Sequence, residues 1–307
     1  MRLLYLDRGQ LRLTEYLHRD IPPYAILSHR WGTTQDEVSY LDIREGAGDR
    51  KSGWAKLRFC GEQARKDDLK YFWVDTCCID KGNPREVSRA IASMFEWYAD
   101  AQQCYVYLAD VTVDPISSRA VHNVAYRPWE RAFRRSQWFT RGWTLQELLA
   151  PARVTFFSSQ GLYLGSRTEL SELIQQITGI DRQALHGKAL SEYSEADRFR
   201  WAVNRQTLEP EDHAYSLLGI FGVSMLPYYG EGEDEAYNRL KEAIIRKRLY
   251  DLIKLDVKQG RRNTEDSEHT TLEATTLAND ESVNRHLNRH RARSHARRLH
   301  QHGLHPF

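Results

Sequence analysis

The first half of the chain alternates short apolar runs with segments of helical periodicity. The apolar runs have the length of buried strands and lie at residues 24–28, 71–75, 104–108 and 154–157. Residues 54–66 and 84–98 place apolar side chains three and four positions apart, as amphipathic helices do. Strands separated by helices of this length predict an α/β fold with a parallel sheet, right-handed crossovers and helices on its faces.

The pattern from residue 159 to about residue 250 is mainly helical. Before it, a helix should stop near Ala150, because Pro151 disfavours helix at the preceding residue, and Thr140 is the expected cap at the start of that helix. Ser194 and Asp197 have the spacing of a helix-capping pair. We therefore expect an N-terminal extension at 1–22, an α/β core at 23–158, a helical part at 159–250 and a tail at 251–307.

The tail differs in composition from the rest of the chain. From about residue 258 it has few large apolar side chains, so burial cannot offset the entropy cost of ordering it, and we expect disorder. Six of its seven histidines have irregular spacing, at positions 286, 290, 295, 300, 302 and 305. This spacing does not indicate a metal site.

Composition narrows the class of protein. With 41% hydrophobic and 28% charged residues, the chain has the balance of a globular protein. No run approaches the roughly 18 apolar residues of a membrane span, and the first ten residues lack the apolar core of a signal peptide, so we expect a cytoplasmic protein that does not bind membranes. Four cysteines without a CxxC pair predict buried thiols and no metal. A formal net charge of +2 gives no reason to expect nucleic acid as a partner.

Five stretches, taken together and in order, resemble the fungal heterokaryon-incompatibility (HET) domain. They are YAILSHRWG at 24–32, WVDTCCIDK at 73–81, SRAIASMFEWY at 88–98, SQWFTRGWTLQELLAP at 136–151, and EDHAYSLLGIF at 211–221 with YGEG at 229–232. Each stretch alone is a weak signal, but five at compatible separations are specific. The resemblance implies a role in the incompatibility reaction that follows fusion of unlike cells, with programmed cell death as its outcome.

A second, more distant resemblance is to Toll/interleukin-1 receptor (TIR) domains of innate immunity. Residues 26–30 are similar to the first TIR strand, residues 77–86 lie where TIR domains have their mobile BB loop, and residues 143–148 (WTLQEL) are similar to a TIR motif whose glutamate cleaves NAD. This resemblance implies a TIR-like, flavodoxin-like fold and an NAD hydrolase in which Glu147 is the catalytic residue. NAD would be the substrate, and no further cofactor is implied.

The chemistry is compatible with a single carboxylate. Cleavage of the nicotinamide–ribose bond passes through an oxocarbenium-like sugar that a carboxylate stabilises, and nicotinamide leaves as a neutral base without a general acid. Trp143 lies four residues before Glu147, where its ring could stack on nicotinamide, and Arg30 could pair with the diphosphate. Open α/β sheets bind ligands at the carboxyl ends of their strands. Further candidates for that rim are Ser28, His29, Trp31, Asp75 and Lys81.

Structural roles are an alternative explanation for the presence of these residues in the motifs. Thr144 and Glu147 have capping-box spacing, Trp143 has the character of a core tryptophan, and Arg30 could hold Asp75 or Glu147 in an internal ion pair. Asp75 could instead cap a loop or a helix, and the role of YGEG stays open.

Three functions therefore compete. The first is a cell-death effector that hydrolyses NAD or a related nucleotide through Glu147. The second is a non-enzymatic signalling adaptor that self-associates or docks onto other HET or sensor proteins. The third is a structural or regulatory protein with a degenerate site. The glycine-rich phosphate loops of ATPases and Rossmann enzymes are not found, so ATP hydrolysis and Rossmann-type redox chemistry are not expected.

Overall fold

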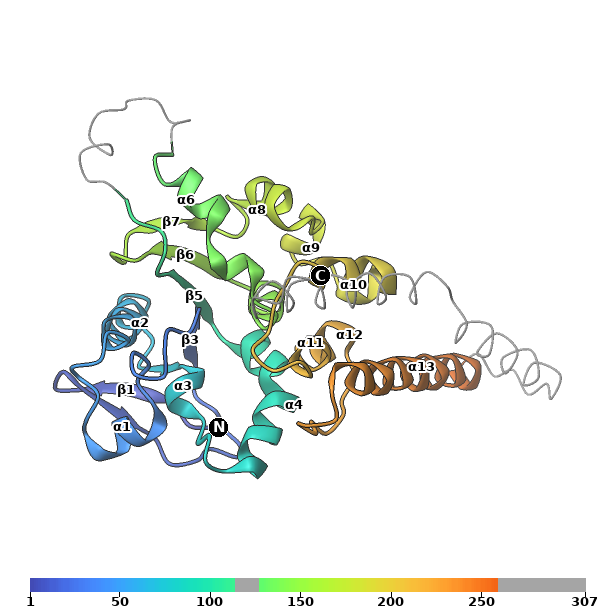
Figure 1. The fold of residues 1–307 in the computed structure, drawn as a ribbon, viewed down its shortest axis with the longest axis horizontal. Helices are drawn as coiled ribbons and strands as arrows, with labels where there is room; N and C mark the ends of the chain where they lie inside the picture. Colours follow the sequence, from blue (N-terminus) through green and yellow to red (C-terminus); the bar gives the residue numbers. More distant parts are fainter. Residues whose placement is uncertain (114–126, 259–307) are drawn as a thin grey trace, which may run out of the picture. The chain divides into compact units, whose positions relative to one another are not determined.

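A computed structural model describes residues 1–113 and 127–258 (Figure 1). The chain divides into two compact units between residues 188 and 189. The first unit holds the whole sheet, and the second is helical. The expected disordered tail lies outside the described residues from position 259 on. In the described ranges, no helix is both long and apolar enough to cross a membrane.

The first unit contains one sheet of seven strands in the order β2-β1-β4-β3-β5-β6-β7. The strands are β1 (Leu4–Asp7), β2 (Gln10–Leu13), β3 (Tyr24–His29), β4 (Tyr71–Trp73), β5 (Gln103–Leu108), β6 (Val154–Ser158) and β7 (Tyr163–Ser166). The four predicted strands are confirmed as β3, β4, β5 and β6, and they run parallel to one another. The sheet as a whole is mixed, because β1 and β7 pair antiparallel with β4 and β6. The predicted parallel sheet is therefore confirmed for the four central strands and does not extend to the strands at the two edges.

The hairpin β1–β2 lies within the segment expected to be an N-terminal extension. Arg8 and Gly9 form its turn with φ values of 49° and 83°, the left-handed pair that matches the twist of a tight hairpin. Leu4 of β1 pairs with Leu13 of β2 on one side and with Phe72 of β4 on the other. The N-terminal residues thus extend the sheet beyond β4.

Helices cover both faces of this sheet. The first unit contains α1 (Tyr40–Glu45), α2 (Trp54–Lys66), α3 (Asp75–Cys78), α4 (Pro84–Asp100), α6 (Glu130–Arg135), the 3-10 turn η1 (Gln137–Thr140), α7 (Thr144–Leu149), α8 (Ser171–Thr178) and α9 (Arg182–Leu185). On one face Phe59 of α2 contacts Tyr107 of β5. On the other, Tyr98 of α4 contacts Trp73 of β4. Since successive strand residues point to opposite faces, these contacts put α2 on one side and α4 on the other.

The four parallel strands are ordered β4-β3-β5-β6, which in chain order is second, first, third, fourth. Doubly wound sheets of this order bind ligands outside the carboxyl ends of the first and third strands, where the direction of winding reverses. Here these are β3 and β5. All six residues of β3 are buried, so the strand is a rigid base for the polar residues at its end.

The helix before Pro151 is shorter than expected. It is α7, six residues long, and Trp143 occupies its N-cap position, so the prediction that Thr140 caps it was wrong. The hydroxyl of Thr144 donates to the carbonyl oxygens of Trp138 and Arg141 at 2.7 and 2.9 Å. These bonds tie the start of α7 to η1, and every residue of α7 is buried. Tertiary contacts, rather than length, hold this helix in place.

The second unit contains η2 (Leu190–Glu192), α10 (Glu195–Ala202), α11 (Asp212–Tyr215), α12 (Leu218–Phe221) and α13 (Glu233–Lys258). Ser194 caps α10 by accepting from the Asp197 amide at 3.1 Å, as predicted. Glu211 explains the YGEG turn, because its Oε1 accepts from the amides of Gly230 and Gly232, both at 2.9 Å. The motif is therefore a loop held by hydrogen bonds to an acidic side chain.

Candidate functional site

A chain of buried hydrogen bonds lies at the carboxyl end of β3. The Ser28 hydroxyl donates to Glu147 Oε2 at 2.5 Å and accepts from the Trp138 indole N–H at 2.8 Å. Ser28 is fully buried, Trp138 is 1% exposed and Glu147 is 7% exposed. β3, η1 and α7 each supply one of the three side chains, so their geometry depends on the fold of the whole unit.

The environment of Glu147 keeps its carboxyl protonated. Burial raises its pKa to about 8, and the negative charge of Asp75 adds to this shift. The hydrogen bond from Ser28 and the positive charge of Arg141 act in the opposite direction. At neutral pH the neutral acid is therefore the main form, whereas an exposed glutamate would be ionised.

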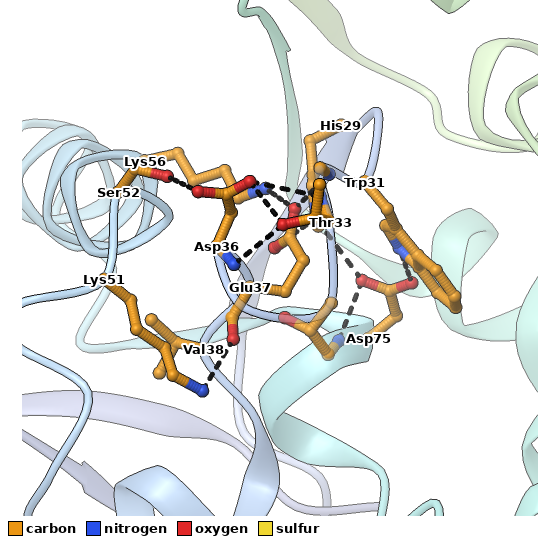
Figure 2. A network of polar contacts seen from close by, with 12 residues as sticks. His29, Trp31, Thr33, Asp36, Glu37, Val38, Lys51, Ser52, Lys56 and Asp75 are labelled. Atoms are coloured by element: carbon orange, nitrogen blue, oxygen red, sulfur yellow. Dashed lines mark hydrogen bonds and ion pairs between the residues drawn. The ribbon is translucent and has the colours of Figure 1, made fainter.

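A second polar cluster surrounds Glu37, in the loop between β3 and α1 (Figure 2). Glu37 Oε1 accepts from Lys56 Nζ at 2.5 Å and from the Gly32 amide at 2.6 Å. Burial alone would raise the pKa of Glu37, but its contacts with His29 and Lys56 outweigh burial and lower that pKa to about 2. Glu37 thus stays ionised and anchors the loop that follows β3.

His29 lies between this cluster and Asp75. Its Nε2 is 3.7 Å from Glu37 Oε2 and 3.9 Å from Asp75 Oδ1, distances too long for hydrogen bonds. Burial and the charge of Lys56 lower the pKa of His29, although the two carboxylates oppose that shift. The imidazole is therefore neutral at pH 7, and its protonated form, present at lower pH, is the form that lowers the pKa of Glu37.

Trp31, Asp75 and Lys81, all expected at the rim, do lie together. The Trp31 indole N–H donates to Asp75 Oδ2 at 2.7 Å, and Lys81 Nζ lies 3.5 Å from the centroid of the Trp31 ring (Figure 2 shows the first of these contacts). The guanidinium of Arg141 is 5.8 Å from the same ring. The indole is thus held by a carboxylate at its edge and by cations at its face.

Comparison with known proteins now decides the family. The model of the heterokaryon incompatibility protein (HET) family matches residues 24–147. These residues are a HET domain. The match includes β3, the Glu37 cluster and Glu147.

The chain is also similar to the vegetative incompatibility protein HET-E-1 of Podospora anserina. The two are 50% identical over 246 residues, which is 80% of this chain and 18% of that protein. The chain therefore spans less than a fifth of the length of this relative. No solved structure matches significantly, so the likeness to TIR domains stays a prediction.

Two further site candidates, Trp143 and Arg30, are at least partly accessible to solvent. Trp143 is half-buried at the N-cap of α7. Arg30 is exposed just beyond β3 and makes no ion pair with Asp75 or Glu147, which removes that structural explanation for it.

The carboxyl of Glu147 is bonded to Ser28 and not to the start of its own helix, so α7 has no capping box. Asp75 begins α3, where its Oδ1 accepts from the Thr76 amide at 2.8 Å.

Sequence reasoning missed three members of these clusters: Trp138, Glu37 and Lys56. Lys56 carried a signal, because it shares the buried stripe of α2 with Cys60 and Ala64, where a lysine requires a partner. Glu37 lies in an irregular polar loop and carried none. Among the residues that the structure describes, no group of three or more His, Cys, Asp or Glu side chains is arranged to hold a metal ion.

Proposed function

We propose that this HET domain is the effector part of an incompatibility protein and that, in the cytoplasm, it cleaves the nicotinamide–ribose bond of NAD or a related nucleotide. One observation carries the proposal: the carboxyl of Glu147 is held by Ser28 at the carboxyl end of β3, next to the point where the sheet reverses its winding. A buried carboxyl with a pKa near 8 costs stability, and such groups gather at functional sites. The resemblance of residues 143–148 to the TIR motif supports the same residue.

The reaction needs the carboxylate of Glu147, and the substrate itself favours that form. The nicotinamide ring of NAD is a cation, and a positive charge near a carboxyl lowers its pKa. The ionised group then stabilises the positive charge that develops on the ribose. Ser28 holds the carboxyl in place through the change, because its hydroxyl donates to Glu147 and is itself fixed by Trp138.

The rim residues have separate roles in this proposal. Trp143 offers a half-buried ring one helical turn from Glu147 for stacking on the nicotinamide. Arg30, Lys81 and the half-buried Trp31 are placed after β3 and α3, where they would meet the rest of the nucleotide. Asp75 positions Trp31 through its indole N–H. No further cofactor or metal takes part.

The burial of Glu147 adds a requirement. At 7% exposure the residue is covered, so a movement that uncovers its carboxyl must precede binding of the nucleotide. We assign this movement to self-association of HET domains or docking onto a sensor partner. Dilute protein is then expected to be inactive and clustered protein active.

The same burial favours a second function. A neutral carboxyl that is satisfied by a hydroxyl can serve the fold alone, and the HET domain would then act as a self-assembling adaptor without catalysis. In that case Glu147 would specify how β3, η1 and α7 pack, and the signal would pass through contacts between domains.

Release of nicotinamide from NAD by clustered protein separates the two functions. Glu147→Gln keeps the size of the side chain and removes its charge, and it should reduce release by at least about 100-fold. Glu172→Gln, at an exposed position of α8, is the matched control and should release nicotinamide at the wild-type rate. Equal rates in all three proteins would remove Glu147 from the mechanism. If clustered, folded wild-type protein released no nicotinamide, the adaptor role would be the function that the data support.

A further inference from the structure

A separate cavity of about 240 Å³ lies at the start of α4, and none of its residues belongs to the site described above. Asn83 caps the helix there, and the cavity is otherwise lined by Arg2, Tyr16, His18, Arg85, Glu86 and Arg89. Three arginines around one small cavity are unusual, because like charges repel unless a counter-charge is present.

One arginine is neutralised by the single acid of the cavity. Arg2 Nη1 donates to Glu86 Oε1, which also accepts from the Asp80 amide at 3.0 Å. The Arg2 guanidinium is 5.3 Å from the ring centroid of Tyr16 and 4.6 Å from that of Tyr40. These contacts hold the side chains of Arg2 and Glu86 in place as part of the lining of the cavity.

The other two arginines are available. Arg85 and Arg89 are exposed, lie one turn apart on α4, and make no ion pair with any residue that the structure describes. Three arginines less one glutamate leave a charge of +2 on the cavity, with His18 not counted. The N-terminus of α4, a helix of 17 residues, adds a partial positive charge on the same side.

We propose that this cavity binds the terminal phosphate of a phosphate monoester or a polyphosphate. Such a group carries a charge of about −1.5 to −2 at pH 7, which matches the +2 of the cavity, and the planar forks of Arg85 and Arg89 suit phosphate oxygens. The volume lies below the roughly 300 to 1,000 Å³ of pockets that enclose drug-sized ligands. The cavity therefore encloses the phosphate alone, and the rest of the ligand stays in solvent. This inference does not depend on the proposed cleavage of NAD.

Binding of inorganic phosphate and pyrophosphate to the full chain tests the site, followed by NMR of the arginine side chains. Saturable binding is expected, and Arg85→Gln combined with Arg89→Gln should weaken it by about tenfold or more. Arg65→Gln, at an exposed position of α2, is the control and should bind as wild type does. Thermal unfolding of each variant shows whether the fold is kept, as expected for exposed side chains.

Vesicles distinguish a free ligand from a lipid headgroup. Phosphatidylcholine vesicles with and without phosphatidic acid are compared in a flotation assay. Binding to inorganic phosphate and pyrophosphate alone identifies a soluble ligand, and additional binding to the phosphatidic acid vesicles that the double variant loses identifies a lipid phosphate. Equal affinity of the double variant and Arg65→Gln for every probe, or no saturable binding of any probe, would overturn the proposal.

Discussion

Ser28 donates a hydrogen bond of 2.5 Å to the carboxyl of Glu147, across 119 positions of the chain. The bond joins the first strand of the parallel sheet to the short helix before Pro151. It also ends a chain that begins at the indole of Trp138. A buried acid is thus held in one orientation by a hydroxyl that cannot turn away without leaving an indole N–H unsatisfied.

The first prediction concerns stability against pH. The pKa of Glu147 is about 8 in the folded protein and near its ordinary value of 4.5 in the unfolded chain. Between these values the unfolded chain releases the proton and the folded protein keeps it. The free energy of unfolding should therefore fall by up to about 1.4 kcal/mol per pH unit from this group, with its contribution fully present only below about pH 4.5.

Glu147→Gln isolates that contribution, because glutamine does not titrate. Urea unfolding at a series of pH values should show the wild type losing stability relative to Glu147→Gln as the pH rises from about 5 to about 8. The reason is that only the wild type must keep a proton on a buried acid. If the free energy of unfolding changed equally with pH in the two proteins, Glu147 would be ionised in the folded protein.

The second prediction concerns Ser28→Ala. This change removes the acceptor of the Trp138 indole and a donor to Glu147, so the free energy of unfolding should fall by about 1–3 kcal/mol. The pKa of Glu147 should rise further, because the hydrogen bond from Ser28 lowers it. Urea unfolding and carbon NMR of the Glu147 carboxyl measure the two effects.

Ser88→Ala is the control for this change. Ser88 is a half-buried serine on α4, whose hydroxyl donates to the Pro84 carbonyl oxygen within the same helix. The loss of this hydroxyl should cost less than about 0.5 kcal/mol. A Ser28→Ala protein with an unchanged pKa at Glu147 would contradict the geometry of the site.

The fold shows which elements the sequence predicts and which it does not. The strands β3, β4, β5 and β6 were predicted because continuous apolar runs mark strands buried on both faces. The hairpin of β1 and β2 was missed, since its four-residue strands have buried, half-buried and exposed positions and its turn has no Asn-Gly or Asp-Gly signal. Thr140 was the expected cap because a helix that begins at Thr144 is too short to be stable alone. The short helix α7 is stabilised by its buried contacts, which the sequence pattern does not report.

The candidate site was predictable to a smaller extent. The motifs gave Ser28 and Glu147, which the fold brings into contact, and Trp31, Asp75 and Lys81, which lie together. The pairing of Ser28 with Glu147 could not be predicted, because a contact between distant positions depends on strand order and register. The burial of Glu147 was not predicted either, since motif spacing does not report which side chains cover a helix.

The third prediction concerns the buried pair of Lys56 and Glu37. Lys56→Met leaves the Glu37 carboxylate buried without its cation, and the free energy of unfolding should fall by about 3–5 kcal/mol. The double variant Lys56→Met with Glu37→Gln should recover much of this loss, because no uncompensated charge remains. Urea unfolding of wild type, Lys56→Met, Glu37→Gln and the double variant forms the cycle. A double variant no more stable than Lys56→Met would contradict the prediction.

The stability contributed by the pair of Lys56 and Glu37 should also depend on pH in the acid range. The pKa of Glu37 is lowered to about 2, so the stability that it contributes is present above about pH 4.5 and is lost as the pH falls toward 2. Wild-type protein should therefore lose more stability over this range than Lys56→Met. An equal loss in both would show that Lys56 does not set the pKa of Glu37.

The fourth prediction concerns the YGEG turn of the second unit. Glu211→Ala frees the amides of Gly230 and Gly232, both of which donate to Glu211 Oε1, and should cost about 1–3 kcal/mol. Hydrogen exchange of these two amides should become faster, because they lose their acceptor. Glu235→Ala, at an exposed position of α13, should leave exchange at both glycines unchanged. Unchanged exchange in Glu211→Ala would mean that another group holds the turn.

The most direct test of the account follows the rate of nicotinamide release against pH, for clustered wild-type protein and clustered Ser28→Ala. Wild type should release nicotinamide faster as Glu147 loses its proton, and Ser28→Ala should need a higher pH for the same step, because it lacks the hydrogen bond that lowers the pKa of Glu147. Identical pH profiles in the two proteins, or release by Glu147→Gln at the wild-type rate, would contradict the assignment of Glu147 as the catalytic residue.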